Sequence, residues 1–196
     1  MEIGPTLATE RLVLRPPRQE DFDGFAAMAQ EEETMRFIGG LSSRDAAWRA
    51  MASLAGSWAL LGYGMFSVLR RDTGEWIGRL GPWRPGGREG GWPGDEVGWG
   101  LKRSAMGQGL AMEGAVAAID WAFDKRGGER VIHCIDKRNA PSIALATAFN
   151  KDGPCCAAPT SVPLVQRPIH RAHRTLTALA VEATVRIGVA QAVREH

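Results

Sequence analysis

The chain has 196 residues, of which 44% are hydrophobic and 23% charged, and this composition fits one globular domain with a sizeable core. Its formal net charge of +2 is too small to indicate nucleic acid or an anionic membrane as a partner. The sequence has no apolar run near the ~20 residues that span a bilayer and no evident signal peptide, so we expect a cytoplasmic protein.

The first predicted elements are a strand over residues 9–15 and a short helix after it. Leu12 and Leu14 alternate with polar or smaller neighbours, which is typical of a strand with one apolar face. Acidic residues stand where the helix begins, and the helix dipole favours negative charge there. We expect Phe22 and Phe25, on the apolar face of this helix, to lie in the core.

A second helix and a hairpin come next. Ser42 or Ser43 is predicted to cap the N-terminus of this helix, and Gly62 to end it. Residues 63–69 and 76–83 are both strand-like and enclose a short turn, which favours a β-hairpin.

Residues 84–94 form a glycine- and proline-rich loop without periodicity. Trp92 in this loop is either exposed at the entry to a substrate site or tucked against the surface, and the sequence leaves both open. The next strand is predicted at residues 95–101, where apolar residues alternate with polar or small ones. Its apolar face consists of Val97, Trp99 and Leu101.

A glycine-bearing turn at residues 106–111 leads from this strand into a long helix. The first N–H groups of a helix have no intrahelical partner, and the dipole favours an anion beside them. Because glycine permits close approach to the backbone, the turn predicts a pyrophosphate cradle. A turn in which glycine serves geometry alone is the alternative. A dinucleotide-binding fold is disfavoured, since its full glycine motif and acidic partner are missing.

The turn resembles the acetyl-coenzyme A loop of the GCN5-related N-acetyltransferases (GNAT), which runs Gln/Arg-x-x-Gly-x-Gly/Ala. Gly109 and Ala111 match its fourth and sixth positions, and Gly107 matches a glycine common at the second. Met106 departs from the first position. The following Glu113 and the opening TERLVLRPPRQEDFDGF resemble the ribosomal-protein-alanine acetyltransferase-like (RimJ/RimL) branch.

The resemblance covers residues 7–146 and implies a single α/β domain with a mixed, twisted sheet flanked by helices. It implies acetyl-CoA as cosubstrate and a primary amine as acceptor, either a peptide N-terminus or a small molecule, with direct transfer. The cofactor-binding residues that it implies are Trp99, Gly100, Leu101, Met106, Gly107, Gln108, Gly109, Leu110, Ala111, Asn139 and Ser142.

Residues 131–135 predict a buried strand, followed by a helix that ends at Ala148. Asn139 is a good N-cap for that helix, with Pro141 in its first turn. The spacing also resembles the family's Asn-x-x-Ser. This resemblance implies that Asn139 contacts the pantetheine arm and that Ser142 lies near the thioester sulfur. The two roles of Asn139 are compatible.

Two residues are candidates for proton transfer. The resemblance implies Glu96, on the central strand, as general base. The alternative is a carboxylate paired with an arginine such as Arg79. Ser142 is the candidate for protonating the leaving thiolate. Relatives often use a tyrosine there, but the only tyrosine is the distant Tyr63, so that role stays open.

No metal site is expected. His133 and Cys134 are neighbours on a predicted strand, so their side chains should point to opposite faces. The other two cysteines, Cys155 and Cys156, are adjacent and do not suggest a disulfide framework.

The segment 151–196 does not resemble the family. We therefore expect the acetyltransferase domain at residues 1–150 and an atypical C-terminal segment after it. No Phe, Trp or Tyr follows Phe149, although strands of a buried sheet are usually rich in them. We hypothesise that this segment is out of frame and packs poorly. An incomplete sheet would leave an exposed edge that favours a homodimer. It would also favour the alternative function, a CoA-binding relative with little or no activity.

Overall fold

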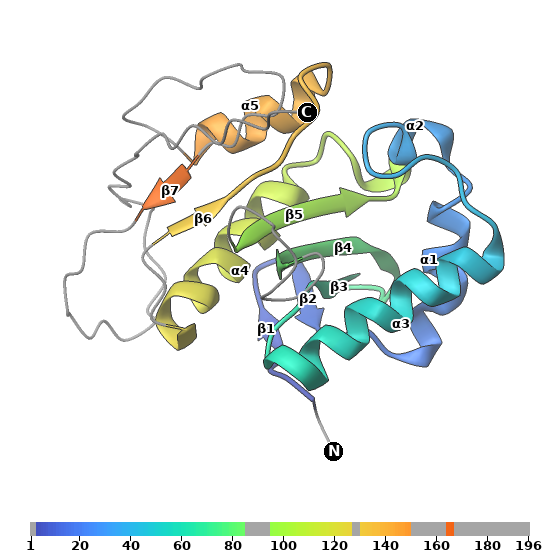
Figure 1. Cartoon of the computed structure of the whole chain (residues 1–196), viewed down its shortest axis with the longest axis horizontal. Helices are drawn as coiled ribbons and strands as arrows, with labels where there is room; N and C mark the ends of the chain where they lie inside the picture. The colour runs from blue at the N-terminus through green and yellow to red at the C-terminus, as the bar shows by residue number, and fades with distance from the viewer. Residues whose placement is uncertain (1–2, 85–94, 127–129, 150–163, 167–196) are drawn as a thin grey trace, which may run out of the picture.

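The computed structural model describes residues 3–84, 95–126, 130–149 and 164–166. Figure 1 shows a twisted sheet with α1 and α3 on one side and α4 on the other, which confirms the predicted α/β class. The elements are β1 (Leu7–Ala8), β2 (Leu12–Arg15), η1 (Gln19–Asp21), α1 (Phe22–Met28), α2 (Glu32–Met35), α3 (Arg44–Leu61), β3 (Phe66–Arg70), β4 (Trp76–Trp83), β5 (Glu96–Leu101), η2 (Arg103–Ala105), α4 (Leu110–Arg126), β6 (Arg130–Ile132), α5 (Ala140–Ala148) and β7 (Leu164–Gln166).

The strands lie in sequence order, from β1 to β7, and the sheet is mixed. Each neighbouring pair is antiparallel except β5 and β6, which are parallel. A parallel pair needs a long crossover, and α4 supplies it. β4 and β5 pair along their whole common length, but β5 and β6 share only the pair Glu96↔Ile132. The two parallel strands therefore separate beyond this pair.

The first predicted strand is shorter than expected. Instead of one strand at residues 9–15, the chain forms β1 and β2, which pair across a tight turn. The Thr9 hydroxyl oxygen accepts a hydrogen bond from the Leu12 N–H at 3.0 Å and holds this turn. Arg15 was expected on the polar face but is only 6% exposed.

Local signals located the next elements well. Ser43 is the N-cap of α3, where its side chain accepts from the Ala46 N–H, and Gly62 ends the helix in the left-handed conformation. The predicted hairpin is β3–β4, and β4 has the predicted bounds. The short helix α2 was not predicted.

The core lies on both faces of the sheet. α4 packs closely on β2 and β4. At Gly114 of α4, an added Cβ would stand only 2.6 Å from Leu80 Cδ2. On the opposite face, α1 and α3 bury Phe25, as predicted, against Trp76. Phe22 is only half-buried, with its ring 5.0 Å from that of Trp48.

The C-terminal half differs in two respects. β6 ends at Ile132, three residues before the predicted end. β7 pairs antiparallel with β6, although no strand was predicted after residue 150. The rest of the segment 151–196, its hypothesised shift of frame and Trp92 lie outside the described residues. Among the described helices, none is long and apolar enough to cross a bilayer.

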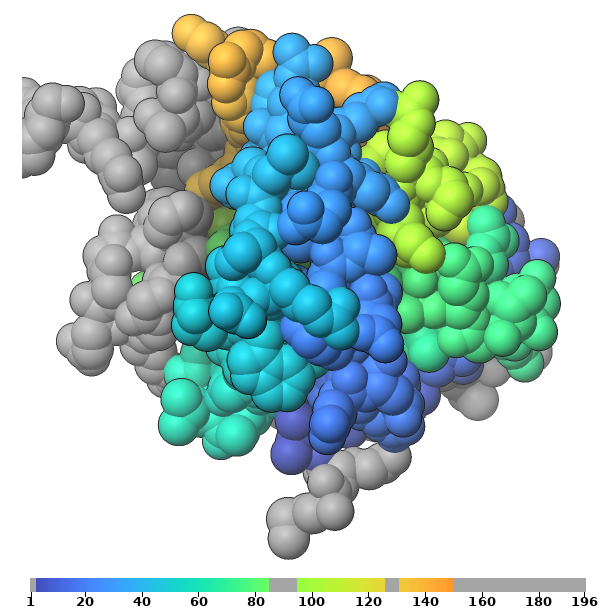
Figure 2. Space-filling model, turned by 90° about the vertical axis from the view of Figure 1, so that its right-hand side faces the viewer, coloured from blue at the N-terminus to red at the C-terminus, as the bar shows by residue number. Residues whose placement is uncertain are grey.

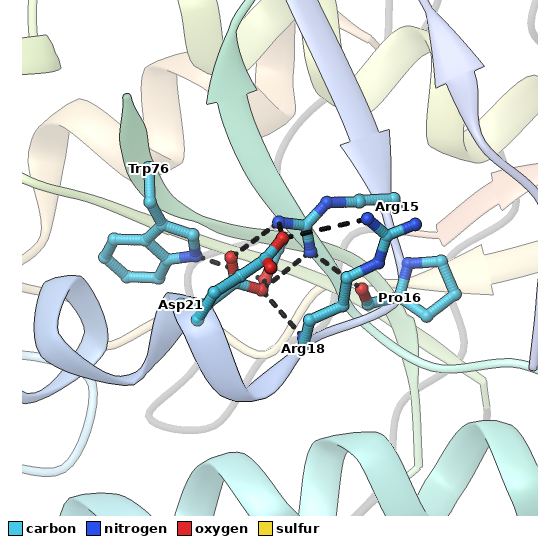
Figure 3. A network of polar contacts seen from close by, with 7 residues as sticks. Arg15, Pro16, Arg18, Asp21 and Trp76 are labelled. Carbon is cyan, nitrogen blue, oxygen red and sulfur yellow. Dashed lines mark hydrogen bonds and ion pairs between the residues drawn. The ribbon is translucent and has the colours of Figure 1, made fainter. Parts of the chain in front are cut away.

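A buried ion pair joins the start of α1 to the sheet (Figure 3). Arg15 donates through Nη1 and Nη2 to the two carboxylate oxygens of Asp21, each at 2.8 Å. Asp21 also accepts from the Ser67 hydroxyl at 2.6 Å and from the Arg18 N–H at 2.8 Å. The Trp76 indole N–H donates to Ser67 at 3.1 Å. The bonds from Arg15, Ser67 and Trp76 therefore link β2, β3 and β4 to the start of α1.

We expect Asp21→Ala to lower the free energy of unfolding by ~3–5 kcal/mol, because it leaves the Arg15 guanidinium buried with the exposed Glu20 as its remaining carboxylate and the Pro16 carbonyl as a neutral acceptor. Asp23→Ala is the matched control, since Asp23 and its partner Arg44 are both exposed, and a surface pair contributes at most about 1 kcal/mol. Urea denaturation of both variants measures the difference. Equal losses in the two variants would contradict a structural role for the network.

Candidate functional site

Two adjoining cavities lie where β5 and β6 separate. The larger has a volume of about 470 Å³ and the smaller about 240 Å³. They share one wall, which consists of Phe37, Ile38, Trp99, Asn139 and Ser142. In Figure 2, the segments that build the larger cavity meet near the top of the molecule: blue residues around α2, yellow-green residues after β5 and orange residues of α5.

The larger cavity contains the predicted cradle. Gly107 and Gly109 have φ of 71° and 75°, a left-handed conformation that favours glycine. A Cβ at Gly107 would meet nothing within 4 Å, so the turn faces open space. α4 begins at Leu110, and its first N–H groups border this space. Every predicted cofactor-binding residue lines the cavity except Gln108.

Gln108 holds the turn instead of lining the cavity. Its side-chain amide donates to the Ser104 carbonyl at 2.7 Å, and its side-chain oxygen accepts from Arg70 at 2.7 Å. Its main-chain carbonyl accepts from Arg11 Nη1 at 2.9 Å. Gln108 is therefore a structural anchor of the cradle.

Glu113 links the cradle helix to the start of the chain. Its Oε1 accepts from the Thr9 hydroxyl at 2.6 Å and from the Arg11 N–H at 2.8 Å, and its Oε2 accepts from Arg11 Nε at 2.7 Å. Burial acts to raise the pKa of Glu113, but these donors outweigh it and hold the pKa below its ordinary value. We name this set of contacts among Thr9, Arg11, Gln108 and Glu113 the clamp.

The smaller cavity lies over one face of β4 and β5. The register pairs Arg79 with Gly100 and Trp83 with Glu96, so Arg79, Trp83 and Glu96 share this face. Gly98 lies between them, and a Cβ there would be 2.8 Å from Met65 Cε. The absence of a side chain at Gly98 keeps the floor of the cavity low.

Glu96 faces this cavity rather than solvent. Its side chain was expected on the polar face of the strand, but the residue is only 5% exposed. Its Oε1 accepts a hydrogen bond from the Cys134 N–H at 3.3 Å. Burial lowers the pKa of Arg79 to about 10, while the charge of Glu96 acts to raise it. Glu96 is thus both a wall of the cavity and an electrostatic partner of Arg79, as the alternative interpretation anticipated.

His133 is the residue that the sequence missed. Its imidazole is 1% exposed and packs beside Trp99 and Phe149, with ring centroids 5.0 Å and 5.9 Å away. Its Nδ1 lies 2.6 Å from the Val97 carbonyl oxygen, which only accepts, so Nδ1 carries the proton and Nε2 keeps a lone pair. Burial lowers the pKa of His133 to about 4, which makes the ring neutral at pH 7.

The shared wall is itself held by hydrogen bonds. Asn139 caps α5 as predicted, with its side-chain oxygen accepting from the Ser142 N–H at 3.3 Å. The Trp99 indole N–H donates to Ser142 Oγ at 3.1 Å, which leaves the serine O–H available as a donor. Tyr63 donates to Asp95 at 3.0 Å and lines neither cavity.

No group of three or more His, Cys, Asp or Glu residues within the described ranges is arranged to hold a metal ion. The prediction that His133 and Cys134 lie on a strand is wrong, because β6 ends at Ile132. Both residues line the smaller cavity. The arrangement therefore offers a glycine turn and the start of α4 beside open space on one side, and a buried carboxylate and imidazole on the other.

Comparisons with known proteins agree with this geometry. The model of the acetyltransferase (GNAT) domain matches residues 11–149. An uncharacterized N-acetyltransferase p20 from Bacillus licheniformis is 30% identical over 152 residues, which cover 76% of this chain and 84% of that protein. An acetyltransferase from Agrobacterium tumefaciens has a similar structure, with a TM-score of 0.71 at 27% identity, over 85% of this chain and 95% of that one. A RimL-type ribosomal L7/L12 acetyltransferase, solved in complex with coenzyme A, has a TM-score of 0.59 at 16% identity, over 74% and 82% of the two chains.

The buried imidazole predicts a pH dependence of stability. Because the pKa of His133 is about 4 in the folded state and near 6.5 when unfolded, the unfolded state binds the proton first as pH falls. Wild-type stability should therefore drop by roughly 2 kcal/mol more than that of His133→Phe between pH 7 and pH 5. Guanidinium denaturation at the two pH values measures this difference, and identical slopes in both proteins would refute it.

Proposed function

The chain belongs to the GNAT acetyltransferase family, and on this premise we propose that it transfers an acetyl group directly from acetyl-CoA to a primary amine. The observation that carries the proposal is the pair of cavities that meet where β5 leaves β6. One contains the anion cradle and the other the buried Glu96. A thioester lying along the shared wall would have the donor's phosphates on one side and the acceptor amine on the other.

Three features support acetyl-CoA as the donor. The family uses acetyl-CoA, and one structural neighbour is solved with coenzyme A bound. The open space beside Gly107 and the start of α4 would receive the pyrophosphate. Trp99, Gly100 and Leu101, on the lining of the same cavity, would follow the pantetheine arm together with Asn139.

The proposed chemistry balances without an enzyme-bound acetyl group. The amine nitrogen attacks the thioester carbonyl, so that a C–N bond forms and the C–S bond breaks. Glu96 takes the proton that the nitrogen loses, and Ser142 passes a proton to the departing thiolate. Solvent then returns a proton to Ser142 and takes one from Glu96, so both residues regain their starting states. The hydrogen bond from Trp99 supports this role of Ser142, because it stabilises negative charge on Oγ. A backbone N–H of β5 would polarise the carbonyl.

The acceptor in this proposal is a peptide N-terminus or a small amine of the RimJ/RimL kind. Structural neighbours of that kind include the RimL-type protein and a putative ribosomal-protein-serine acetyltransferase from Vibrio cholerae, at 16% and 18% identity. Identities this low support the fold alone. A CoA-binding protein with little turnover is the alternative, and CoA binding without acetylated product would favour it.

The clamp should determine affinity for the donor. We expect Glu113→Ala to raise the Kd for CoA about tenfold, because loss of a charged hydrogen-bond acceptor frees Arg11 and loosens the turn at Gln108. The exposed Glu10→Ala is the control. Calorimetric titration with CoA measures both, and an unchanged Kd in Glu113→Ala would remove the clamp from the cofactor site.

Turnover should depend on Glu96 and donor binding on Asn139. We expect Glu96→Gln to lower kcat by about 10²–10⁴ while leaving the Kd for CoA unchanged. Asn139→Ala should weaken CoA binding instead. Thiol release and mass spectrometry of the product, with a panel of primary amines, measure turnover. Full activity in Glu96→Gln would exclude it as the base, and circular dichroism checks that each variant folds.

A further inference from the structure

The smaller cavity contains buried polar atoms that protein groups do not satisfy. Within the part of the chain that the structure describes, Arg79 Nε and His133 Nε2 are buried without a hydrogen-bond partner, and both residues line this cavity. Buried polar groups are usually hydrogen-bonded, so an orphaned pair in a cavity indicates a ligand that supplies the partners. Arg79 can only donate, and His133 Nε2 can only accept.

Arg79 is poorly matched by its protein neighbours. Its Nη1 donates to the Met65 sulfur at 2.9 Å, a weak acceptor, and its guanidinium lies 5.8 Å from the centre of the Phe25 ring. Glu96 contributes charge but no hydrogen bond that compensates Nε. A guanidinium presents donors in a planar fork that matches the two oxygens of a carboxylate.

The opposite requirement holds beside His133. A neutral imidazole with a bare Nε2 needs an N–H or O–H donor from the ligand. The buried carboxylate of Glu96 lines the same cavity and favours a positive charge. An amine meets both conditions, because its N–H groups can donate to Nε2 while its charge is balanced by Glu96.

The remaining charges do not disturb this match. Asp136 also lines the cavity, but Arg138 donates to it from Nε, Nη2 and its own N–H at 2.7–3.0 Å. These bonds hold the pKa of Asp136 well below its usual range and its charge is already compensated. The cavity therefore offers a guanidinium with one unsatisfied N–H and a carboxylate, which suits a ligand that carries both charges.

The size of the cavity points to a small ligand. Its volume of about 240 Å³ is below the ~300–1,000 Å³ that is usual for ligand pockets. Apolar side chains complete its walls, among them Phe37, Met65 and Trp99. These would cover an aliphatic side chain of modest length.

We propose that the acceptor is a small apolar amino acid, with its amine at Glu96 and His133 and its carboxylate on Arg79. The inference rests on the proposed function, because it identifies the acceptor of that same transfer. It also gives His133 a role as a positioning residue, which orients the lone pair of the amine toward the thioester.

Matched acceptors test this assignment. For alanine, valine and leucine, kcat/KM is compared with that of the corresponding amino amide, the decarboxylated amine and a dipeptide with the same N-terminal residue. We expect the free amino acid to be at least tenfold better than its amide. Arg79→Gln should abolish this advantage, so that kcat/KM for the free amino acid falls to that of its amide. The exposed Arg49→Gln is the matched control and should keep the advantage.

A second variant, Arg79→Lys, tests the same site if Arg79→Gln does not fold. Arg79→Lys keeps the charge but loses the fork, so it should retain only part of the preference for the carboxylate. His133→Phe should raise KM for amino acid and decarboxylated amine alike, since both present the same N–H groups. Equal activity of acid, amide and dipeptide in the wild type would overturn the proposal in favour of an N-terminal peptide acceptor.

Direct binding separates this inference from the proposed function. Calorimetry with the same amino acids on the CoA-loaded protein should show binding that Arg79→Gln abolishes. Such binding without any N-acetyl product would overturn the transferase proposal and leave the acceptor site intact. Acetylation of amines with no preference for a carboxylate would support the transferase proposal and overturn the assignment of the acceptor site. Absence of Arg79-dependent binding would refute the site itself.

Discussion

The separation of β5 from β6 is the constraint on which the candidate site depends. The strands share one pair, Glu96↔Ile132, and then diverge, which would leave the Val97 carbonyl without a partner. The His133 Nδ1–H donates to that carbonyl, so the imidazole lies where the two strands diverge. A buried backbone acceptor must be paired, and at this point a side chain pairs it where the neighbouring strand no longer does. Both cavities lie around the opening that results.

The N-terminal part of the chain supports the two sides of this opening. The clamp joins the first turn of α4 to residues at the start of the chain, across a separation of about a hundred positions. The Arg15–Asp21 pair fixes α1 to the sheet, and the segment after α1 supplies Phe37 and Ile38 to the shared wall. Polar contacts made by N-terminal residues therefore position a cavity that is lined mainly by residues later in the sequence.

The titratable groups of the smaller cavity are not arranged for stability alone. Burial lowers the pKa of both Arg79 and His133, so each is disfavoured in its charged form by its surroundings. Well-packed apolar residues would avoid that cost. Perturbed, incompletely satisfied groups that gather in one cavity are typical of a site whose remaining partners arrive with the substrate.

The sequence by itself determined the features that local chemistry controls. Ser43 and Asn139 cap helices through their own side chains, Gly107 and Gly109 need a left-handed backbone, and β4 shows its turn and alternation within a few residues. The GNAT motif is of the same local kind. The resemblance already implied Glu96 as the base for the acceptor, with Arg79 as its alternative partner. Only the tertiary structure decided that both line one cavity and that the His133 side chain pairs with the Val97 carbonyl between the diverging strands. Their environments arise from pairing across long separations and from the early end of β6, and no window of sequence contains either cause.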